Sequence, residues 1–185
     1  LALSNASVVW RDDVLGMGGV AALSVDLHPT VRGASGKVAL GRPATLRVGD
    51  HETSFTADAQ IAWDGAQLSF ESLRLNAPEG TLSAAGSVGL LAAGRPMSID
   101  ASGSADLDRL ATWFALSQRP LGRVAFRAHA TGSLADPSAD VTLTAQNLAW
   151  QGFTQVSVDA AMHVDRDALD TGRFNVRAFG GTVTG

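Results

Sequence analysis

Apolar and polar residues alternate along most of the chain with a period of two. In the stretch 55–63 the odd positions are all apolar, and the even positions are mostly polar. The stretches 124–130 and 156–164 show the same alternation. Successive side chains of a strand point to opposite faces, so this period predicts strands with one apolar face. Turn sequences rich in Gly, Pro and Asp separate about a dozen such runs. We therefore predict an all-β protein built as one long, curved antiparallel sheet.

Two of the runs change phase partway along. Leu68 and Phe70 occupy even positions, whereas Leu73 occupies an odd one. A similar change falls between Ala145 and Leu148. A change of phase moves side chains to the other face unless a bulge absorbs a residue. These sites are therefore either β-bulges that bend the sheet or the ends of strands.

One stretch departs from the period of two. Apolar residues in 107–114 recur at the three- and four-residue spacing of a helix. Ser104 or Asp106 is placed to cap the start of this helix, and Pro120 follows its end. We predict a short helix near residues 106–117 that plugs one end of the sheet or covers its apolar face.

The chain also matches itself after a shift of 101 residues, which aligns 58–82 without a gap on 159–183. Asp64 and Asp165 then fall on equivalent turn positions, where Asp is favoured because its carboxylate bonds to nearby backbone. Repetition of strand units builds an elongated sheet in which each unit adds to its neighbour. We interpret residues 1–185 as a single β-rich repeat segment of a larger protein.

The composition argues against several classes of partner. The net charge is −4, Lys37 is the one lysine, and the arginines are scattered singly, so the sequence has no basic stripe for nucleic acid. Cysteine is absent, which excludes disulfides and thiolate metal sites within the chain. No apolar run approaches the roughly 18 residues that span a bilayer.

Signatures of catalysis and of cofactor binding are also missing from the sequence. The 4 histidines lie far apart and form no pair at metal-ligand spacing. The local pairs of aspartates lack the pattern of a calcium loop, and no nucleophile elbow is present. We therefore predict a protein that is not an enzyme and that holds no cofactor and no metal.

A polysaccharide-binding domain would present exposed aromatic platforms beside acidic residues. Tyr is absent, and aromatic residues make up only 6% of the chain. Trp10, Trp63 and Trp150 recur at the ends of predicted strands, which favours a packing role for them.

Four phrases of the sequence carry a family resemblance. They are "LRLNAPEGTLSAAGSV" at 73–88, "SIDASGSADLDRLATWF" at 98–114, "LGRVAFRAHATGSLADPSADVTLTAQNLAWQG" at 121–152, and the closing "FNVRAFGGTVTG". The most specific element runs from Gly122 to Trp150. With these phrases the chain resembles the AsmA-like superfamily of Gram-negative bacteria, and most closely its TamB-type translocation and assembly module proteins.

The resemblance implies a taco-like β-groove, U-shaped in section. It implies a place in the periplasm of a Gram-negative bacterium, within a protein anchored in the inner membrane. Such proteins are thought to carry phospholipid between the inner and outer membranes. They also support outer-membrane biogenesis and protein secretion with an outer-membrane barrel partner, which would bind through regions outside this chain.

An apolar face on a one-sided sheet needs something to cover it. It becomes an ordinary core if the sheet closes on itself, and it can hold phospholipid acyl chains if the sheet stays open. The candidate residues for lining such a groove are the large apolar residues of the alternating runs: Phe55, Ile61, Trp63, Leu68, Phe70, Val124, Phe126, Val156, Val158, Met162, Val164, Phe174 and Val176. The alternative is a structural β-scaffold without a lipid ligand, which binds client proteins by strand addition at its open edges.

Overall fold

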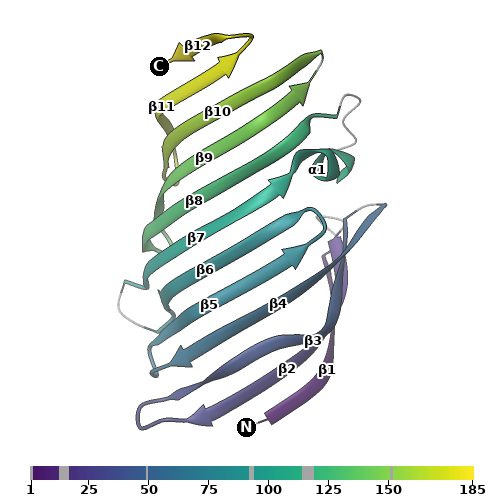
Figure 1. The fold of residues 1–185 in the computed structure, drawn as a ribbon. Helices are drawn as coiled ribbons and strands as arrows, with labels where there is room; N and C mark the ends of the chain where they lie inside the picture. The colour runs from purple at the N-terminus through teal and green to yellow at the C-terminus, as the bar shows by residue number, and fades with distance from the viewer. Residues whose placement is uncertain (1, 13–16, 49, 92–93, 114–118, 151) are drawn as a thin grey trace.

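The computed structural model describes residues 2–12, 17–48, 50–91, 94–113, 119–150 and 152–185. Within these residues the protein forms one antiparallel sheet of 12 strands, in which each strand pairs with its neighbours along the chain (Figure 1). The strands are β1 (Ala2–Asp12), β2 (Met17–Pro29), β3 (Ala34–Val48), β4 (His51–Trp63), β5 (Gln67–Ala77), β6 (Gly80–Gly89), β7 (Pro96–Asp106), β8 (Leu121–Ser133), β9 (Pro137–Trp150), β10 (Phe153–Val164), β11 (Leu169–Ala178) and β12 (Gly181–Thr184). The predicted all-β fold with a long antiparallel sheet is confirmed.

The sheet is a simple meander, because each strand pairs antiparallel with the strand that precedes it along the chain. Figure 1 shows the strands stacked in chain order, from β1 at one end to β12 at the other. Strands β1 to β3 bend strongly along their length in this view. Their registers shift at several points, for example between Ala39 and Ala44 of β3, and such irregularities are the usual cause of a bent strand.

Both changes of phase mark β-bulges, and the first of these bulges recurs in the second copy of the repeat. In the β4–β5 pair, Gln60 faces Ser72 and Ile61 faces Phe70, so Glu71 is the extra residue. The bulge absorbs the change of phase, so Phe70 and Leu73 stay on one face.

The second copy of the repeat has the same bulge. In the β10–β11 pair, Ala161 faces Arg173 and Met162 faces Thr171, which leaves Gly172 as the extra residue. Glu71 and Gly172 are 101 positions apart, which is the shift that aligns the two copies. The second phase change also marks a bulge, because Val156 faces Leu148 whereas Val158 faces Ala145.

The turns that follow β4 and β10 are equivalent as well. The Asp64 Oδ1 atom accepts hydrogen bonds from the backbone N–H groups of Ala66 (2.9 Å) and Gln67 (2.7 Å). The Asp165 Oδ1 atom accepts the corresponding bonds from Asp167 (2.9 Å) and Ala168 (2.7 Å). The predicted role of both aspartates as turn residues is confirmed.

The single helix of the described residues is α1 (Leu107–Trp113), at the end of β7. The backbone N–H of Arg109 donates to the Asp106 Oδ1 atom at 3.3 Å, so Asp106 is the N-cap that the sequence offered. Ala111 is buried, and the helix packs against β7 and β8. The helix predicted near residues 106–117 is thus confirmed as far as Trp113, and residues 114–118 lie outside the described residues.

The sheet remains open and has little closed core. Its two edges are β1 and β12, which do not pair with each other. The accessible surface is 11911 Å², whereas a compact globular protein of 19.1 kDa exposes about 8,400 Å². Among the described residues, the buried hydrophobic side chains are those of Ala44, Ala111 and Ala145. One face of the sheet therefore lacks a second layer to pack against.

Candidate functional site

The strand register places all of the candidate lining residues on one face of the sheet, which we call the apolar face. Directly opposed residues of paired strands share a face. Ile61 of β4 is opposite Phe70 of β5, and Trp63 is opposite Leu68. Phe55 lies on the same face of β4 as Ile61 because the two positions differ by an even number.

At the other end of the sheet the register gives the same result. Val124 of β8 is opposite Ala145 of β9, which is opposite Val158 of β10. Val158 in turn faces Val176 of β11, and Val176 faces Val183 of β12. The remaining candidates of this half lie in parallel rows of the same face: Phe126, Val156, Met162, Val164 and Phe174.

The rows are continuous across the sheet and include residues that the candidate set lacks. One row crosses eight strands, from β3 to β10: Val38, Ala59, Leu73, Ala84, Ala101, Ala128, Val141 and Met162. Leu73 and Val141 belong to alternating runs, so the period of two could have identified them. The position of the small residues in the middle of the row depends on register, which the sequence does not display.

Small residues line the apolar face over β6, β7 and β8, so few side-chain atoms project from the sheet there. Ala84, Ala101 and Ala128 are opposed there, and Gly103 lies opposite Phe126. A Cβ atom on Gly103 would overlap the carbonyl oxygen of Thr81 and lie 2.7 Å from the Phe126 Cε1 atom. The Phe126 ring therefore occupies the space above Gly103.

Most side chains of the apolar face are neither buried nor fully exposed. Large side chains such as Ile61 and Val158 are half-buried by their row neighbours, and the Phe174 side chain is 37% exposed. Apolar area of this kind gains free energy from any apolar cover, at roughly 25 cal/mol per Å² removed from water. The face therefore gains free energy from an apolar ligand and from an apolar protein surface alike.

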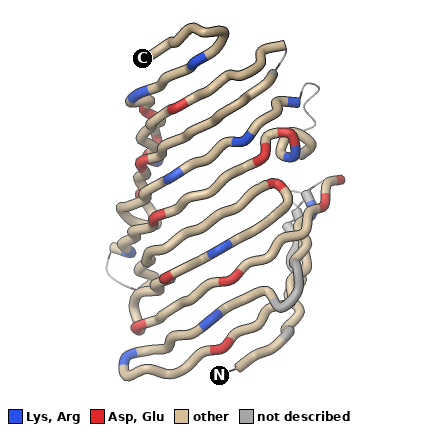
Figure 2. The backbone as a smooth tube through the Cα atoms, in the orientation of Figure 1, with Lys and Arg blue, Asp and Glu red and all other residues tan. Residues whose placement is uncertain are grey.

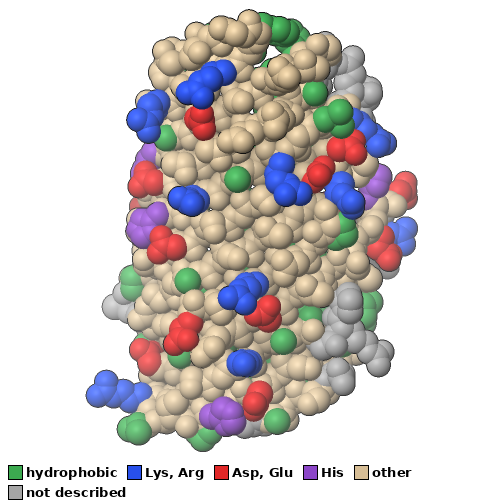
Figure 3. Space-filling view, viewed as in Figure 1, with side chains coloured by type: hydrophobic (Ala, Val, Ile, Leu, Met, Phe, Trp, Pro, Cys, Tyr) green, Lys and Arg blue, Asp and Glu red, His purple; other side chains and the backbone are tan. Residues whose placement is uncertain are grey.

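The opposite face, which we call the polar face, carries the charged residues. Figure 2 shows acidic and basic residues interspersed along the strands, without a stripe of one sign. Figure 3 looks onto this face, where hydrophobic side chains appear singly among polar ones. A face of this composition is stable in water without a partner.

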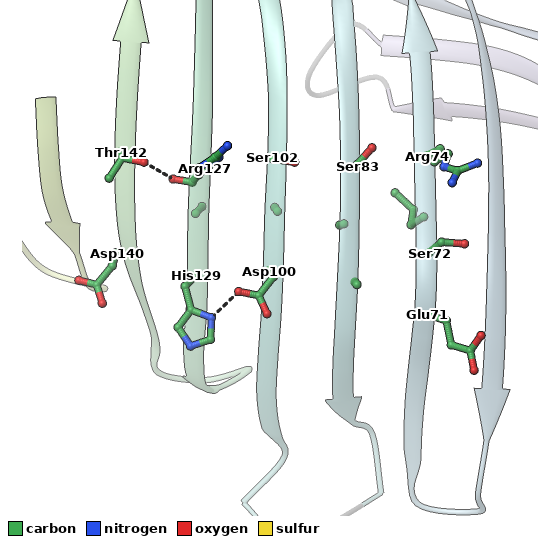
Figure 4. A pocket seen from close by; sticks show the side chains of 15 residues that line it. Glu71, Ser72, Arg74, Ser83, Asp100, Ser102, Arg127, His129, Asp140 and Thr142 are labelled. Carbon is green, nitrogen blue, oxygen red and sulfur yellow. Dashed lines mark hydrogen bonds and ion pairs between the residues drawn. The ribbon is translucent and has the colours of Figure 1, made fainter. Parts of the chain in front are cut away.

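A shallow hollow of about 660 Å³ lies on the polar face over β5 to β9. Arg74 and Arg127 flank it, and the short side chains of Ser83 and Ser102 lie between them (Figure 4). Short side chains in a row between long ones account for the hollow.

Two histidine–aspartate pairs bridge neighbouring strands on the polar face. The His129 Nδ1 atom lies 2.8 Å from the Asp100 Oδ1 atom, and the His163 Nδ1 atom lies 2.8 Å from the Asp140 Oδ1 atom. The Nε2 atom of His163 also lies 3.2 Å from the Ser138 Oγ atom. These pairs were missed by sequence reasoning because their members are 23 to 29 positions apart along the chain.

Ser138, His163 and Asp140 are connected in the order of a catalytic triad, but their surroundings differ from those of one. Asp140 is 76% exposed and His163 is 48% exposed, so water screens the pair. A triad acts in a site that excludes water and that holds donors for an oxyanion. The hydrogen bond to Asp140, together with the charges of Asp165 and Asp170, raises the pKa of His163 above its usual value.

The described residues contain no cluster of three or more His, Cys, Asp or Glu side chains that could hold a metal ion. Within the same residues, no helix is long and apolar enough to cross a membrane. Comparisons of the chain with protein-family models, with curated proteins and with solved structures give no match.

Proposed function

We propose that this chain is a segment of a hydrophobic β-groove that holds the acyl chains of phospholipid. The observation that carries the proposal is the apolar face itself. Its rows run without interruption across the sheet, and the open sheet leaves that face without a protein layer over it. A protein that keeps such a face in water needs an apolar ligand or an apolar partner to cover it.

The energy of this contact is sufficient for a lipid. Each buried methylene contributes about 0.8 kcal/mol, so a chain of about fifteen methylenes gains on the order of 10 kcal/mol before the cost of ordering it. The contact is non-directional. Rows of Val, Leu, Phe and Ala therefore hold an acyl chain without fixing it at one place along the sheet.

The family resemblance supports a wider role for the groove. The resemblance to AsmA-like and TamB-type proteins implies that the groove takes part in moving phospholipid between the inner and outer membranes. By that resemblance the segment belongs in the periplasm, within a protein anchored in the inner membrane that supports outer-membrane biogenesis and protein secretion. We propose the same setting for this chain.

Photo-crosslinking in cells tests the proposal directly. A photoreactive amino acid replaces Phe126 or Val158 on the apolar face, and the adducts are identified by mass spectrometry. Arg127 and Asp159, the next residue along each strand, point to the polar face and serve as matched controls. We expect phospholipid adducts at Phe126 and Val158 and none at the two controls.

The other outcomes are equally informative. The absence of any adduct at Phe126 and at Val158 would overturn the lipid proposal. Protein adducts at both, without lipid, would instead favour the alternative scaffold that binds client proteins. Lipid adducts of equal yield on both faces would indicate non-specific contact with membranes and would also count against a groove.

A further inference from the structure

Five residues of the polar face form a row in which Asp and His alternate, which we call the Asp–His row. It consists of Asp100 on β7, His129 on β8, Asp140 on β9, His163 on β10 and Asp170 on β11. Each member lies directly opposite the next in the strand register. The row therefore crosses five neighbouring strands in a single line.

Two of the four contacts in the row are already close. Asp100 bonds to His129, and Asp140 bonds to His163, each at 2.8 Å. Figure 4 shows His129 standing between Asp100 and Asp140, with its hydrogen bond directed to Asp100. His163 has a partner at each ring nitrogen, because its Nε2 atom lies 3.2 Å from the Ser138 Oγ atom. A protonated imidazole, which donates from both nitrogens, satisfies that arrangement.

The charge of the row depends on the two imidazoles. When both are protonated, the signs alternate, and each positive ring lies between two carboxylates. When both are neutral, three carboxylates remain on every second strand, about 9.6 Å apart for strands spaced about 4.8 Å apart. The attraction across the strands is then lost, and a weak repulsion takes its place.

We propose that the Asp–His row is a proton-operated strap that holds strands β7 to β11 together more firmly when its histidines are protonated. Protonation places a positive imidazolium between each two of the three carboxylates, so that every side chain of the row attracts its neighbours. The strap acts from the polar face, so it does not depend on what covers the apolar face. The strap spans β7 to β11, which extend from the part of the sheet where small residues line the apolar face toward the C-terminal end of the sheet.

The other charged groups around the two rings modify this balance. Arg127 lies two residues from His129 on β8 and therefore on the same face of the sheet. Asp165, at the end of β10, and Asp170, opposite His163 on β11, both favour protonation of His163. Arg166 lies in the same turn as Asp165. Arg173 of β11 lies opposite Ala161, two residues from His163, on the polar face. On β7 and β9 the residues beside the row on the polar face are Ser98, Ser102, Ser138 and Thr142, which carry no charge.

The sign of the pH effect on stability follows from the direction in which the pKa of His163 is shifted. The pKa of His163 in the folded protein is raised above 6.5, chiefly by the hydrogen bond to Asp140. The contribution of this pair is therefore fully present below about pH 6.5 and is lost as the pH rises through the folded-state pKa. Both pairs are exposed, so the effect is local and salt-dependent.

Amide hydrogen exchange of the intact chain tests the strap. Exchange is measured at pH 5.5 and pH 8 in low salt, and each rate is corrected for the intrinsic effect of pH. Protection of the β8, β9 and β10 amides is expected to be about two- to five-fold higher at pH 5.5, the size typical of exposed ion pairs. Strands β4 and β5 serve as the internal reference, and 1 M salt should remove the difference.

Two variants and one matched control assign the effect to the row. His163→Gln and His129→Gln keep a polar side chain and should each reduce the pH dependence, and the double variant should abolish it. His28→Gln is the control, because His28 contacts Asp26 of its own strand at 3.5 Å, a contact that does not link two strands. Asp140→Asn provides an independent variant that should also flatten the pH dependence if the double variant fails to fold.

Any of three results would overturn the proposal. The first is equal protection of β8 to β10 at both pH values in the wild-type protein. The second is a pH dependence that survives in the double variant or in Asp140→Asn. The third is an equal loss in His28→Gln, which would assign the effect to the overall charge of the chain.

Discussion

Asp64 and Asp165 occupy equivalent positions in the two copies of the repeat and make equivalent hydrogen bonds. Each carboxylate accepts two backbone hydrogen bonds within its own turn, and those bonds lower the pKa of both groups below the usual 3.8. A carboxylate held in this way stabilises the fold above pH 3.8, and the effect is lost as the pH falls through the folded-state pKa. The turns therefore contribute to stability at neutral pH and weaken in acid.

NMR titration of the side-chain carboxyl groups checks this interpretation. We expect Asp64 and Asp165 to titrate below 3.8 in the folded chain. Asp165→Ala should lower the melting temperature, because the N–H groups of Asp167 and Ala168 lose their acceptor. Asp167→Ala is the matched control, since this residue contributes its backbone N–H to the turn, which the substitution keeps. Equal losses in the two variants would contradict the turn role of Asp165.

Gly103 is one position on the apolar face where the structure leaves no room for a side chain. A Cβ atom there would overlap the Thr81 carbonyl oxygen and press against the Phe126 ring. Gly103→Ala is expected to destabilise the protein by roughly 1–3 kcal/mol, the usual cost of overpacking, in urea unfolding. Gly172→Ala is the control, because the added Cβ atom would lie an ordinary 3.7 Å from the Ala161 carbonyl oxygen. A near-neutral result for Gly103→Ala would mean that the Phe126 ring and the Thr81 carbonyl group both move aside at little cost.

The strands show why some features were predictable and others were not. Alternation, turn residues and the change of phase at Phe70 are local signals, and they gave the strands, the hairpins and the bulge at Glu71. Which residues oppose one another depends on the sum of all bulges along a pair of strands. The small-residue middle of the apolar face and the His129–Asp100 pair follow from that register, so no local pattern displays them. The sequence also does not show whether the sheet is open, because a closed core and an open face give the same alternation of apolar and polar residues.

Helix α1 is short, so its stability depends on its cap and on its packing against β7 and β8. Asp106→Ala removes the acceptor of the Arg109 N–H and is expected to cost about 0.5–1 kcal/mol, since the 3.3 Å bond is a long one. The loss should appear as faster amide exchange in Leu107–Trp113 while the exchange of β4 and β5 stays unchanged. Asp108→Ala, in the same first turn, is the matched control for loss of a negative charge. Similar effects of the two substitutions would assign the stabilisation to the helix dipole and not to the cap.

The linear order of the strands makes this protein resemble a repeat array more than a globular domain. Each strand pairs only with its neighbours along the chain within the described residues, and the bulge and turn of one copy return in the next. In such arrays stability is close to a sum of unit and neighbour terms. The same arrangement explains how an apolar face can continue from unit to unit, because no strand crosses over to close it.

An open sheet should also unfold with an unusually small dependence on denaturant. An unfolded chain of 19.1 kDa exposes about 27,700 Å², so a compact fold would bury about 19,300 Å² on folding. This protein, with 11911 Å² exposed, buries about 15,800 Å² by the same reference. Because the urea m-value scales with that area, we expect it to be about one-fifth lower than for a compact domain of equal length.

An m-value equal to that of a compact domain would contradict the open sheet in solution. Copies that cover each other's apolar faces would give the same value, and dilution distinguishes the two cases, because only self-association makes the unfolding midpoint depend on protein concentration.

A short-chain phospholipid below its critical micelle concentration provides the complementary measurement. If the ligand binds the folded apolar face, the midpoint should rise with lipid concentration in the wild-type chain. A charge on that face, as in Val158→Asp, should abolish the rise, whereas Ser157→Asp on the polar face of the same strand should retain it.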